Sequence, residues 1–413
     1  MAATEYQPLP GVAADEERPS GGTVVMKFGG TSVGDTERLL LVVRRLVAAH
    51  EEGNRVVGVL SAMGRTTDEL VDLAHQISVR PKPRAMDMLI SVGERISCAL
   101  AEMAIEDLGH QAISLTGSQA GIVTDTTHTK AKIVDVRARR IHEALDEDRI
   151  VLVAGFQGVS TAQEVTTLGR GGSDMTAVVL AAALGADRCE IYTDVDGVYT
   201  ADPRLVPGAR KLNAISYDEM LELAASGAKV LQLRSVEFAR NHGVKLHVRS
   251  SFGDAGGTWI TWEDDPMLEK AMISGVTHAL DETVYRVEGL PPARLFAELA
   301  EANVNVDTIL QAGGEVVFSA PDGDHAEVSA VLDRLGGRWS SRDDLGKVSI
   351  VGAGMKSHPG VAAKAFATLD ELGIQPEVVT TSPIKISCHI PDADLERAVV
   401  ALHEAFELER VNA

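Results

Sequence analysis

Short apolar runs alternate with longer amphipathic stretches from residue 23 to residue 254. The runs at 23–28, 56–60 and 150–156 are continuously apolar or β-branched, which is typical of strands buried on both faces of a parallel sheet. Further strands are expected at 189–193 and 245–248, and helices at 36–52, 67–79, 85–108, 131–146, 174–184 and 217–232. This alternation predicts a three-layer α/β domain with a mostly parallel sheet.

The C-terminal part of the chain repeats itself at an interval of 70 residues. Phe296 and Phe366 each begin a Phe-Ala-x-Leu segment, and the segments 318–322 and 388–392 both end in Pro-Asp. Each copy reads as strand, helix, two strands and helix, which predicts a ferredoxin-like α+β unit. Two copies indicate a paired module, because a solenoid needs about three repeats or more.

These patterns predict five segments. They are a flexible leader rich in Pro, Gly and acid (1–22), the α/β domain (23–254), a Gly-rich and acidic linker (255–269), and two α+β domains (270–345 and 346–413). The strand-to-helix turn of the first copy is shortened by five residues. Gly289 stands 7 positions before Phe296, whereas Gly354 stands 12 before Phe366.

The charge balance excludes several classes of partner. Lys and Arg number 39 against 60 Asp and Glu, a net charge of −21, which disfavours nucleic acid and anionic membranes. No apolar run approaches the roughly 20 residues that span a bilayer, and the N-terminus lacks the features of an export signal. The three cysteines lie far apart and suggest neither a disulfide framework nor a metal site. We expect a reduced, soluble, cytoplasmic protein.

Three segments carry residues suited to phosphate chemistry. Residues 27–32 (Lys-Phe-Gly-Gly-Thr-Ser) place a lysine and two glycines at the end of a strand, although a bare turn explains them equally well. In 169–174 (Gly-Arg-Gly-Gly-Ser-Asp), Ser173 suits an N-cap and Asp174 a first helical turn, but Arg170 is left free for a carboxylate or phosphate. Residues 192–204 are either a solvated turn or a nucleotide-binding loop.

In this order, and with Ser-Val-Gly-Glu at 91–94 and Ser-Gly-Ala-Lys-Val-Leu at 226–231, the segments resemble the aspartate kinases of the amino acid kinase family. The repeat resembles that family's paired ACT domains, and the resemblance runs from about residue 23 to the C-terminus. It implies that ATP phosphorylates the β-carboxylate of L-aspartate, giving 4-phospho-L-aspartate, the first step towards lysine, threonine and methionine. Mg²⁺ would bridge the phosphates through their oxygens and water. Because a β-carboxylate has a pKa of about 3.9, no general base is required.

The resemblance also implies residue roles. Lys27 would bridge the phosphates and Asp174 would orient it, while Glu94 would contact the α-ammonium of aspartate and Arg170 its α-carboxylate. Other residues expected at the aspartate are Ser61, Thr67, Gly171, Gly172 and Ser173. Those expected at the nucleotide, besides Lys27, are Gly29, Gly30, Thr193, Asp194, Tyr199, Asp202, Arg204 and Lys229.

Simpler interpretations exist for several of these residues. Glu94 could be a solvated surface acid, Lys229 could pair with Glu222 on its own helix, and Asp202 could only initiate a turn. The stretch 86–89 (Met-Asp-Met-Leu) is interpreted as part of an apolar core rather than as a site.

The regulatory region departs from the family pattern. The shortened turn lies in the first copy, and Gln311 is followed by Ala-Gly-Gly, whereas Asp307 and Ser382 are retained. The candidate effector residues are Asp307, Gln311 and Ser382. We therefore expect weakened or altered feedback by lysine or threonine, with the ACT pair serving chiefly as a homodimer interface. Met267 or Met272 could start a separate C-terminal subunit, which the sequence does not decide.

Two other functions compete with this interpretation. One is a related amino acid kinase that acts on glutamate, acetylglutamate or a carbamate. The other is a non-catalytic amino-acid sensor, which predicts loss of a charged catalytic residue, yet Lys27, Arg170 and Asp174 are all present.

Overall fold

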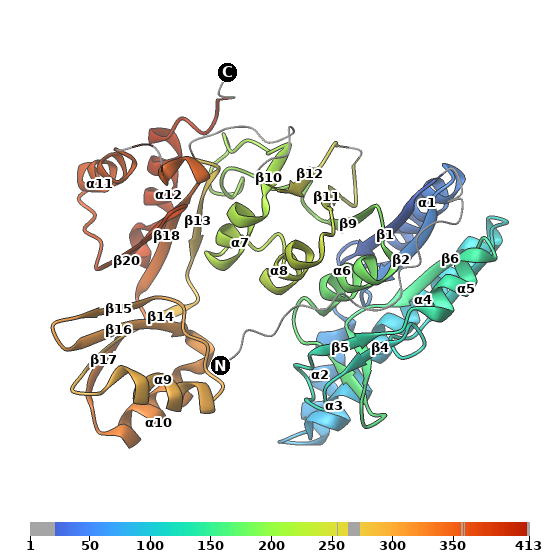
Figure 1. Ribbon diagram of the computed structural model, residues 1–413, viewed down its shortest axis with the longest axis horizontal. Helices are drawn as coiled ribbons and strands as arrows, with labels where there is room; N and C mark the ends of the chain where they lie inside the picture. Colours follow the sequence, from blue (N-terminus) through green and yellow to red (C-terminus); the bar gives the residue numbers. More distant parts are fainter. Residues whose placement is uncertain (1–20, 254, 263–272, 357, 359, 411–413) are drawn as a thin grey trace. The chain divides into compact units, whose positions relative to one another are not determined.

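The computed structural model describes residues 21–253, 255–262, 273–356, 358 and 360–410, and the chain divides into two compact units (Figure 1). The first unit comprises the described residues of Met1–Val198, Asn213–Tyr217 and Val230–Leu268. The second comprises those of Tyr199–Leu212, Asp218–Lys229 and Glu269–Ala413. Most of the expected leader lies outside the described residues, as do much of the expected linker and both Met267 and Met272.

An eight-stranded sheet forms the centre of the first unit, and its order is β10-β12-β11-β9-β1-β2-β6-β3. All neighbouring pairs are parallel except β11 and β12. From one edge to the other the strands are β10 (Ala214–Ser216), β12 (Thr258–Thr261), β11 (Leu246–Ser250), β9 (Arg188–Thr193), β1 (Thr23–Phe28), β2 (Arg55–Leu60), β6 (Ile150–Ala154) and β3 (Ala112–Leu115). The expected mostly parallel α/β sheet is therefore confirmed.

Alternating residues of β1 face different helices. Val24, Met26 and Phe28 pack in one apolar core with residues of α1 (Thr36–Glu51) and α4 (Val92–Asp107). Lys27, which alternates with them, contacts α6 (Gly172–Leu184), and α6 in turn contacts α8 (Leu233–His242). Successive strand residues point to opposite faces, so helices cover both sides of the sheet. This alternation puts the charged Lys27 on the α6 side.

A second, four-stranded sheet of the first unit has the order β5-β4-β7-β8. Its strands are β5 (Ile133–Val136), β4 (Ile122–Thr124), β7 (Gln157–Ser160) and β8 (Val165–Thr167). The remaining helices of the first unit are α2 (Thr66–Ile77), α3 (Pro83–Ile90) and α5 (Arg139–Asp146); α7 (Tyr217–Ala225) begins in the first unit and continues in the second. Helix α3 contacts β8.

Three helix predictions were wrong in part. The helix expected at 85–108 is two helices, which meet at Ser91. The one expected at 131–146 begins only at Arg139, because the β-branched segment before it forms β5. The one expected at 217–232 ends at Ala225, close before Gly227, whose φ of +110° a helix cannot accommodate, and α8 was not expected.

The second unit contains two four-stranded antiparallel sheets, each packed against two helices. One has the order β15-β16-β14-β17 and the other β13-β18-β20-β19. Elements of the first are β14 (Glu282–Glu288), α9 (Pro292–Glu301), β15 (Ile309–Ala312), β16 (Glu315–Pro321), α10 (His325–Leu335) and β17 (Arg338–Arg342). Elements of the second are β13 (Gly275–Ala279), β18 (Leu345–Val351), α11 (Val361–Glu371), β19 (Val378–Ser382), β20 (Lys385–Pro391) and α12 (Leu395–Ala405). Single 3-10 turns span Asp322–Asp324, Ala353–Lys356 and Asp392–Asp394.

Strand β13 precedes the first copy of the repeat but belongs to the sheet of the second copy, where it pairs with β18. In Figure 1 it lies beside β18, while the orange strands β14–β17 form the other sheet. The first copy is thus inserted between β13 and β18, and the range 270–345 contains one strand of the other sheet. A repeat in the sequence shows which segments correspond, but not which sheet a connecting strand joins.

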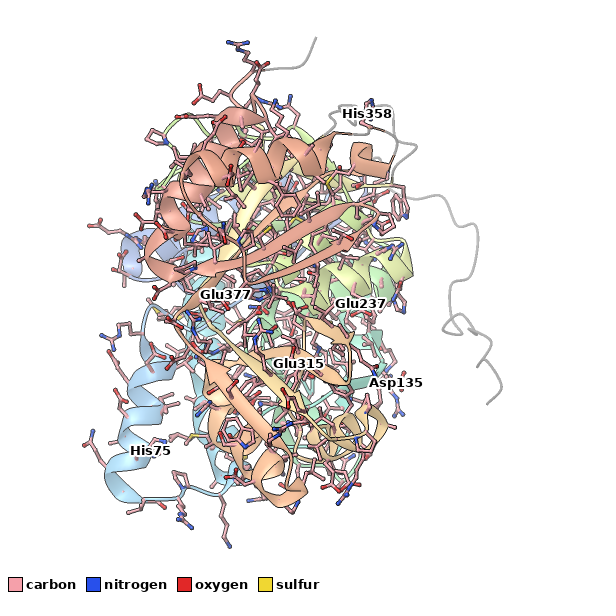
Figure 2. All side chains as sticks on the ribbon, turned by 90° about the vertical axis from the view of Figure 1, so that its left-hand side faces the viewer. His75, Asp135, Glu237, Glu315, His358 and Glu377 are labelled. Carbon is pink, nitrogen blue, oxygen red and sulfur yellow. The ribbon has the colours of Figure 1, made fainter. Side chains whose placement is uncertain are left out.

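Ion pairs connect the two sheets of the second unit. Arg286 on β14 lies 3.8 Å from Glu377, which precedes β19 of the other sheet. It also lies 3.4 Å from Glu315 on β16 of its own sheet, and both glutamates are labelled in Figure 2. Lys347 on β18, which is 1% exposed, lies 2.5 Å from Glu282 on β14. Across the described part of the chain, no helix is long and apolar enough to cross a membrane.

Candidate active site

The carboxyl ends of β1, β2 and β9 meet at one edge of the large sheet, because these strands are parallel neighbours. Ligands of open α/β sheets bind at this edge. The segment after β1 carries Gly29 and Gly30, Ser61 follows β2, and Thr193 ends β9. The topology therefore brings four predicted site residues to the edge where a ligand is expected.

Lys27 and Asp174 form an ion pair at this edge. Nζ of Lys27 lies 2.6 Å from Oδ1 of Asp174, and the two side chains are 12% and 10% exposed. Asp174 lies in the first turn of α6, where a carboxylate is favoured by the helix dipole. A side chain on Gly29 would place Cβ 3.4 Å from the same Nζ, so glycine keeps the lysine ammonium accessible. The pair holds a positive charge in a fixed place beside open backbone.

The glycines around Arg170 give its turn a backbone conformation that other residues rarely adopt. Gly169 and Gly171 have φ of +79° and +70°, and a Cβ on Gly171 would lie 1.9 Å from Cγ of Gln232. Arg170 is exposed and makes no hydrogen bond or ion pair with any other described residue. Gly171, in left-handed conformation, is the N-cap of α6, so the expected capping role of Ser173 was wrong. Ser173 is a buried residue of the first turn.

Glu94 is buried rather than solvated, so the interpretation as a surface acid was wrong. It is 3% exposed in the first turn of α4, and burial raises its pKa to about 7, although backbone amides and the charge of Arg95 act in the opposite direction. Its Oε2 has no hydrogen-bond partner among the described residues. Gly93 permits this packing, since a Cβ there would lie 2.6 Å from Cβ of Ala62. A buried carboxylate oxygen without a partner is suited to receive an ammonium group.

Ser61 and Thr67 are half-buried in the first unit. The Ser61 amide donates to the carbonyl of Phe28 at 3.1 Å, and the Ser61 carbonyl accepts from Oγ of Ser97 at 2.8 Å. Thr67 lies in the first turn of α2. Thr193 donates through Oγ1 to Oδ1 of Asp194 at 3.0 Å, and Asp194 is exposed. The roles of these residues stay predictions.

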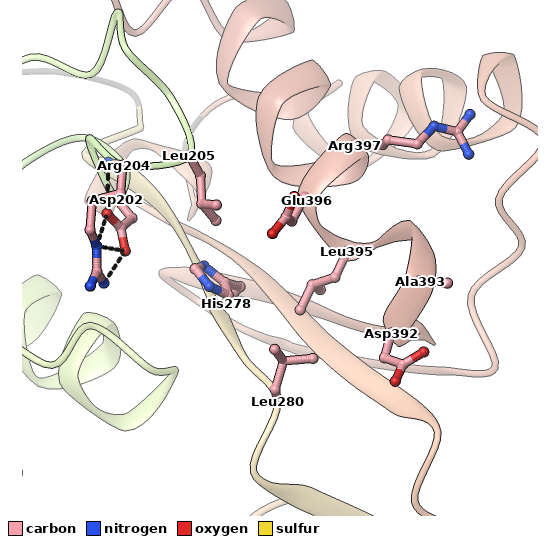
Figure 3. A pocket seen from close by; sticks show the side chains of 10 residues that line it. All are labelled: Asp202, Arg204, Leu205, His278, Leu280, Asp392, Ala393, Leu395, Glu396 and Arg397. Atoms are coloured by element: carbon pink, nitrogen blue, oxygen red, sulfur yellow. Dashed lines mark hydrogen bonds and ion pairs between the residues drawn. The ribbon is translucent and has the colours of Figure 1, made fainter.

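Four residues expected at the nucleotide belong to the second unit. Arg204 binds both carboxylate oxygens of Asp202, and this guanidinium holds the pKa of Asp202 below its usual value. They line a pocket of about 420 Å³ together with residues of β13 and α12, among them His278 and Glu396 (Figure 3). Lys229 lies 3.0 Å from Asp281, whereas Glu222 pairs with Lys385 at 2.8 Å. Tyr199 forms an isolated β-bridge with Lys211. Nucleotide contact by these residues stays a prediction.

Two of the three candidate effector residues have partners of their own. Asp307 contacts the ammonium of the buried Lys347, and Ser382 donates to Glu222 at 3.4 Å. Gln311 is exposed on the edge strand β15. The structure therefore places these three residues in separate surroundings.

Sequence reasoning missed Asp87. It assigned 86–89 to an apolar core, but Asp87 is a fully buried acid that accepts hydrogen bonds from His128, Thr129 and Thr167. A carboxylate within an apolar helix stripe was the available signal, because a buried charge requires donors around it.

Comparisons with known proteins show the family of this chain. Residues 22–250 match the model of the amino acid kinase family, and residues 348–406 match an ACT domain. The aspartokinase of Mycolicibacterium smegmatis is 53% identical over 405 residues, covering 93% of this chain and 96% of the relative. That of Corynebacterium glutamicum is 50% identical over 405 residues, with the same coverage.

Solved structures are similar as well. E. coli aspartokinase III in complex with aspartate and ADP superposes with a TM-score of 0.83 at 26% identity, covering 93% of this chain and 99% of that one. An aspartate kinase from Synechocystis gives a TM-score of 0.54 at 41% identity, covering 93% and 69%. The chain belongs to the amino acid kinase family and, within it, to the aspartokinases.

Proposed function

We propose that this chain transfers the γ-phosphoryl group of ATP to the β-carboxylate of L-aspartate through the residues gathered at the edge of the large sheet. The observation that carries this is the buried Lys27–Asp174 ion pair, which fixes an ammonium beside the glycines after β1. A phosphoryl transfer needs charge neutralisation and alignment more than covalent chemistry. A lysine held in place by a carboxylate supplies the first of these.

Aspartate recognition needs complementary charges. Neither Oε2 of the buried Glu94 nor the guanidinium of Arg170 has a partner among the described residues. Glu94 would receive the α-ammonium, and Arg170 would bind the α-carboxylate. Holding both ends of the amino acid leaves the β-carboxylate directed at the phosphorus, which lowers the entropic cost of the reaction. The β-carboxylate is ionised at neutral pH and attacks without a base.

Mg²⁺ would enter with the nucleotide as its complex. Within the described residues, no group of three or more His, Cys, Asp or Glu is arranged to hold a metal. The ion would be held mainly by phosphate oxygens and water, an arrangement that needs no cluster of three protein ligands.

The ACT pair supports a homodimer. Strand β15 is the edge of its sheet, and all four of its residues are exposed, with Ile309 at 50% and Leu310 at 42%. An exposed apolar edge strand is a template for pairing with another chain. We propose that a second copy of this chain covers it.

Feedback by lysine or threonine would be weakened. Only three residues separate β14 from α9 in the first copy, against nine between β18 and α11 in the second. Asp307, the acid expected to hold an effector's ammonium, already contacts the ammonium of Lys347. A shortened turn and an acid with an internal partner leave less to bind an amino acid.

The test of the reaction is aspartyl-hydroxamate formation from ATP, Mg²⁺, L-aspartate and hydroxylamine. We expect aspartate-dependent product that glutamate, acetylglutamate and carbamate do not replace, and its loss in Lys27→Ala and Asp174→Ala. ATP consumption with one of the other acceptors would indicate a sister kinase. Absence of turnover with every acceptor would favour the sensor.

A further inference from the structure

Asp87 is a buried charge that the proposed reaction does not use directly. Its side chain on α3 is 0% exposed. One oxygen accepts from Oγ1 of Thr167 at 2.6 Å, the other accepts from Nδ1 of His128 at 2.6 Å, and the amide of Thr129 lies 3.1 Å from both. Three donors from two separate segments therefore converge on one carboxylate.

The first segment, 128–131, has a backbone that needs to be held. Thr129 has a φ of +65°, a left-handed conformation that a β-branched residue rarely adopts. The Asp87 carboxylate binds the amide of this residue and the ring of the residue before it. Strain of this kind persists only where the surroundings enforce it.

The second segment leads directly to Arg170. Thr167 ends β8, and its carbonyl accepts from the amide of Ala131 at 2.9 Å, which joins the two segments. Two residues later stands Gly169, where a Cβ would lie 3.2 Å from the carbonyl oxygen of Thr129. The amide of Gly172 closes the turn by donating to the carbonyl of Gly169 at 3.0 Å. The entry to the Arg170 turn is thus packed on the segment that Asp87 holds.

Arg170 itself has no such support. It is exposed, has no partner among the described residues, and stands between two glycines with positive φ. The direction of the Arg170 side chain therefore depends on the backbone segments before and after the turn. On the entry side, the buried charge of Asp87 holds this backbone through its hydrogen bonds with Thr167 and Thr129.

We propose that Asp87 is a positioning residue that holds the Gly169–Arg170 turn in the geometry required to recognise the α-carboxylate of the substrate. The inference rests on the proposed function, in which Arg170 binds that carboxylate. Asp87 does not touch the substrate, so its removal weakens aspartate recognition while leaving the nucleotide site unchanged.

The test is Asp87→Leu, which keeps a branched side chain but accepts no hydrogen bond. We expect the KM for aspartate to rise at least tenfold, the KM for MgATP to stay within twofold, and kcat to fall less than kcat/KM for aspartate. The matched control is Asp135→Asn. Asp135 lies on β5, in the same four-stranded sheet as Thr167, is labelled in Figure 2, and pairs with the exposed Arg137. This control should leave both KM values unchanged. A lower melting temperature with both KM values unchanged would show a merely structural role and overturn the proposal.

Thr167→Val removes one donor to Asp87 with little change of volume. This variant tests the same proposal if Asp87→Leu does not fold. We expect a smaller rise in the KM for aspartate, and no further rise when it is combined with Asp87→Leu. Fully multiplicative effects in the double variant, or an unchanged KM in Thr167→Val, would contradict the proposal.

Arg170→Ala distinguishes a failure of the proposed role of Arg170 from a failure of the proposed role of Asp87. If it leaves the KM for aspartate unchanged, the proposed role of Arg170 fails and this inference fails with it. If it raises that KM while Asp87→Leu and Thr167→Val do not, only the inference about Asp87 is wrong.

Discussion

Nζ of Lys27 and Oδ1 of Asp174 lie 2.6 Å apart, and the pair joins the end of β1 to the first turn of α6. The lysine comes from the strand and the acid from the helix that packs on it, so the fold itself fixes the distance between them. A pair that is about nine-tenths buried is less screened than a surface pair, and removing one partner leaves the other without its counter-charge.

Removal of either partner should therefore reduce turnover sharply. Lys27→Ala loses the charge at the phosphates and Asp174→Ala frees the lysine, and we expect each to lower kcat by about 100-fold or more. The control is Asp146→Asn, which breaks the exposed pair with Arg55 at the same 2.6 Å and should leave kcat unchanged. Steady-state hydroxamate assays measure all three, and a loss below about fivefold in Lys27→Ala would remove Lys27 from the mechanism.

Aspartate recognition should depend on pH through Glu94. Burial raises its pKa to about 7, and the ammonium of aspartate requires the ionised form. The KM for aspartate should therefore be constant above pH 8 and rise towards tenfold per unit below pH 7. Glu94→Gln should raise the KM at pH 8 and flatten this profile. A wild-type KM that does not change between pH 8 and pH 6 would contradict the role.

The same residue should affect stability in a definite direction. Because the folded pKa of about 7 exceeds the value of 4.5 for an exposed glutamate, the folded state binds more protons between these two values. The contribution of Glu94 to the free energy of unfolding therefore falls as pH rises through this window. Above pH 7 the cost is at most about 3.5 kcal/mol, at about 1.4 kcal/mol per unit of pKa. Glu94→Gln should be more stable than the parent at pH 8, and by a smaller margin at pH 5.5, as measured by urea unfolding.

Lys347 should be the most costly charge to remove from the second unit. It lies at 1% exposure between Glu282 and Asp307. Burial alone would raise the pKa of Glu282, but His389 and the Lys347 ammonium outweigh it and lower that pKa to about 2. Lys347→Met leaves two acids without their cation and should lower the free energy of unfolding by about 3–5 kcal/mol.

Two comparisons make this measurement specific. Asp344→Asn breaks an exposed pair with Arg342 in the same unit and should cost less than about 1 kcal/mol. The stability that Glu282 contributes is present above its unfolded pKa of 4.5 and is lost as pH falls towards 2. Equal costs for the two variants in urea unfolding at pH 7 would show that the buried network contributes little.

Much of the fold could be predicted because it is recorded in local patterns. The strands at 23–28 and 150–156 are continuous apolar runs, and the structure has β1 and β6 there. Strand β5 was missed because its apolar residues also fit a helical period. Its pairing with β4, which makes it a strand, joins segments that are separated in the sequence. The sheet to which β13 belongs is likewise decided by tertiary pairing.

Site residues could be named from the sequence, but their surroundings could not. The sequence allowed Glu94 to be a surface acid, but Glu94 is buried. It assigned Asp87 to an apolar core, where Asp87 is indeed buried but is surrounded by hydrogen-bond donors. Burial depends on what packs against a residue from elsewhere in the chain, such as Ala62 beside Gly93 or Thr167 beside Asp87. Residue types therefore indicate the chemistry, while pKa shifts and positioning contacts require the fold.

The dimer should depend on the exposed edge of β15. Leu310→Glu adds a charge to the apolar surface of an edge strand, which disfavours pairing with a second strand. By light scattering at micromolar concentration, we expect the parent to be a dimer and the Leu310→Glu variant to be a monomer. Leu40→Glu, at a similarly exposed position on α1 of the first unit, is the control and should remain dimeric. A Leu310→Glu variant that is still a dimer would place the interface elsewhere.

Feedback should be weak because the expected effector turn is short and its acid is already paired. Three residues join β14 to α9, and Asp307 contacts the ammonium of Lys347. We expect lysine and threonine, singly or together at millimolar concentration, to reduce hydroxamate formation by less than twofold. The buried ammonium has to leave Asp307 before an effector's ammonium can replace it, and Lys347 is held by Glu282 as well. Strong inhibition by either amino acid below one millimolar would mean that another part of the ACT pair binds it, and would overturn the proposal.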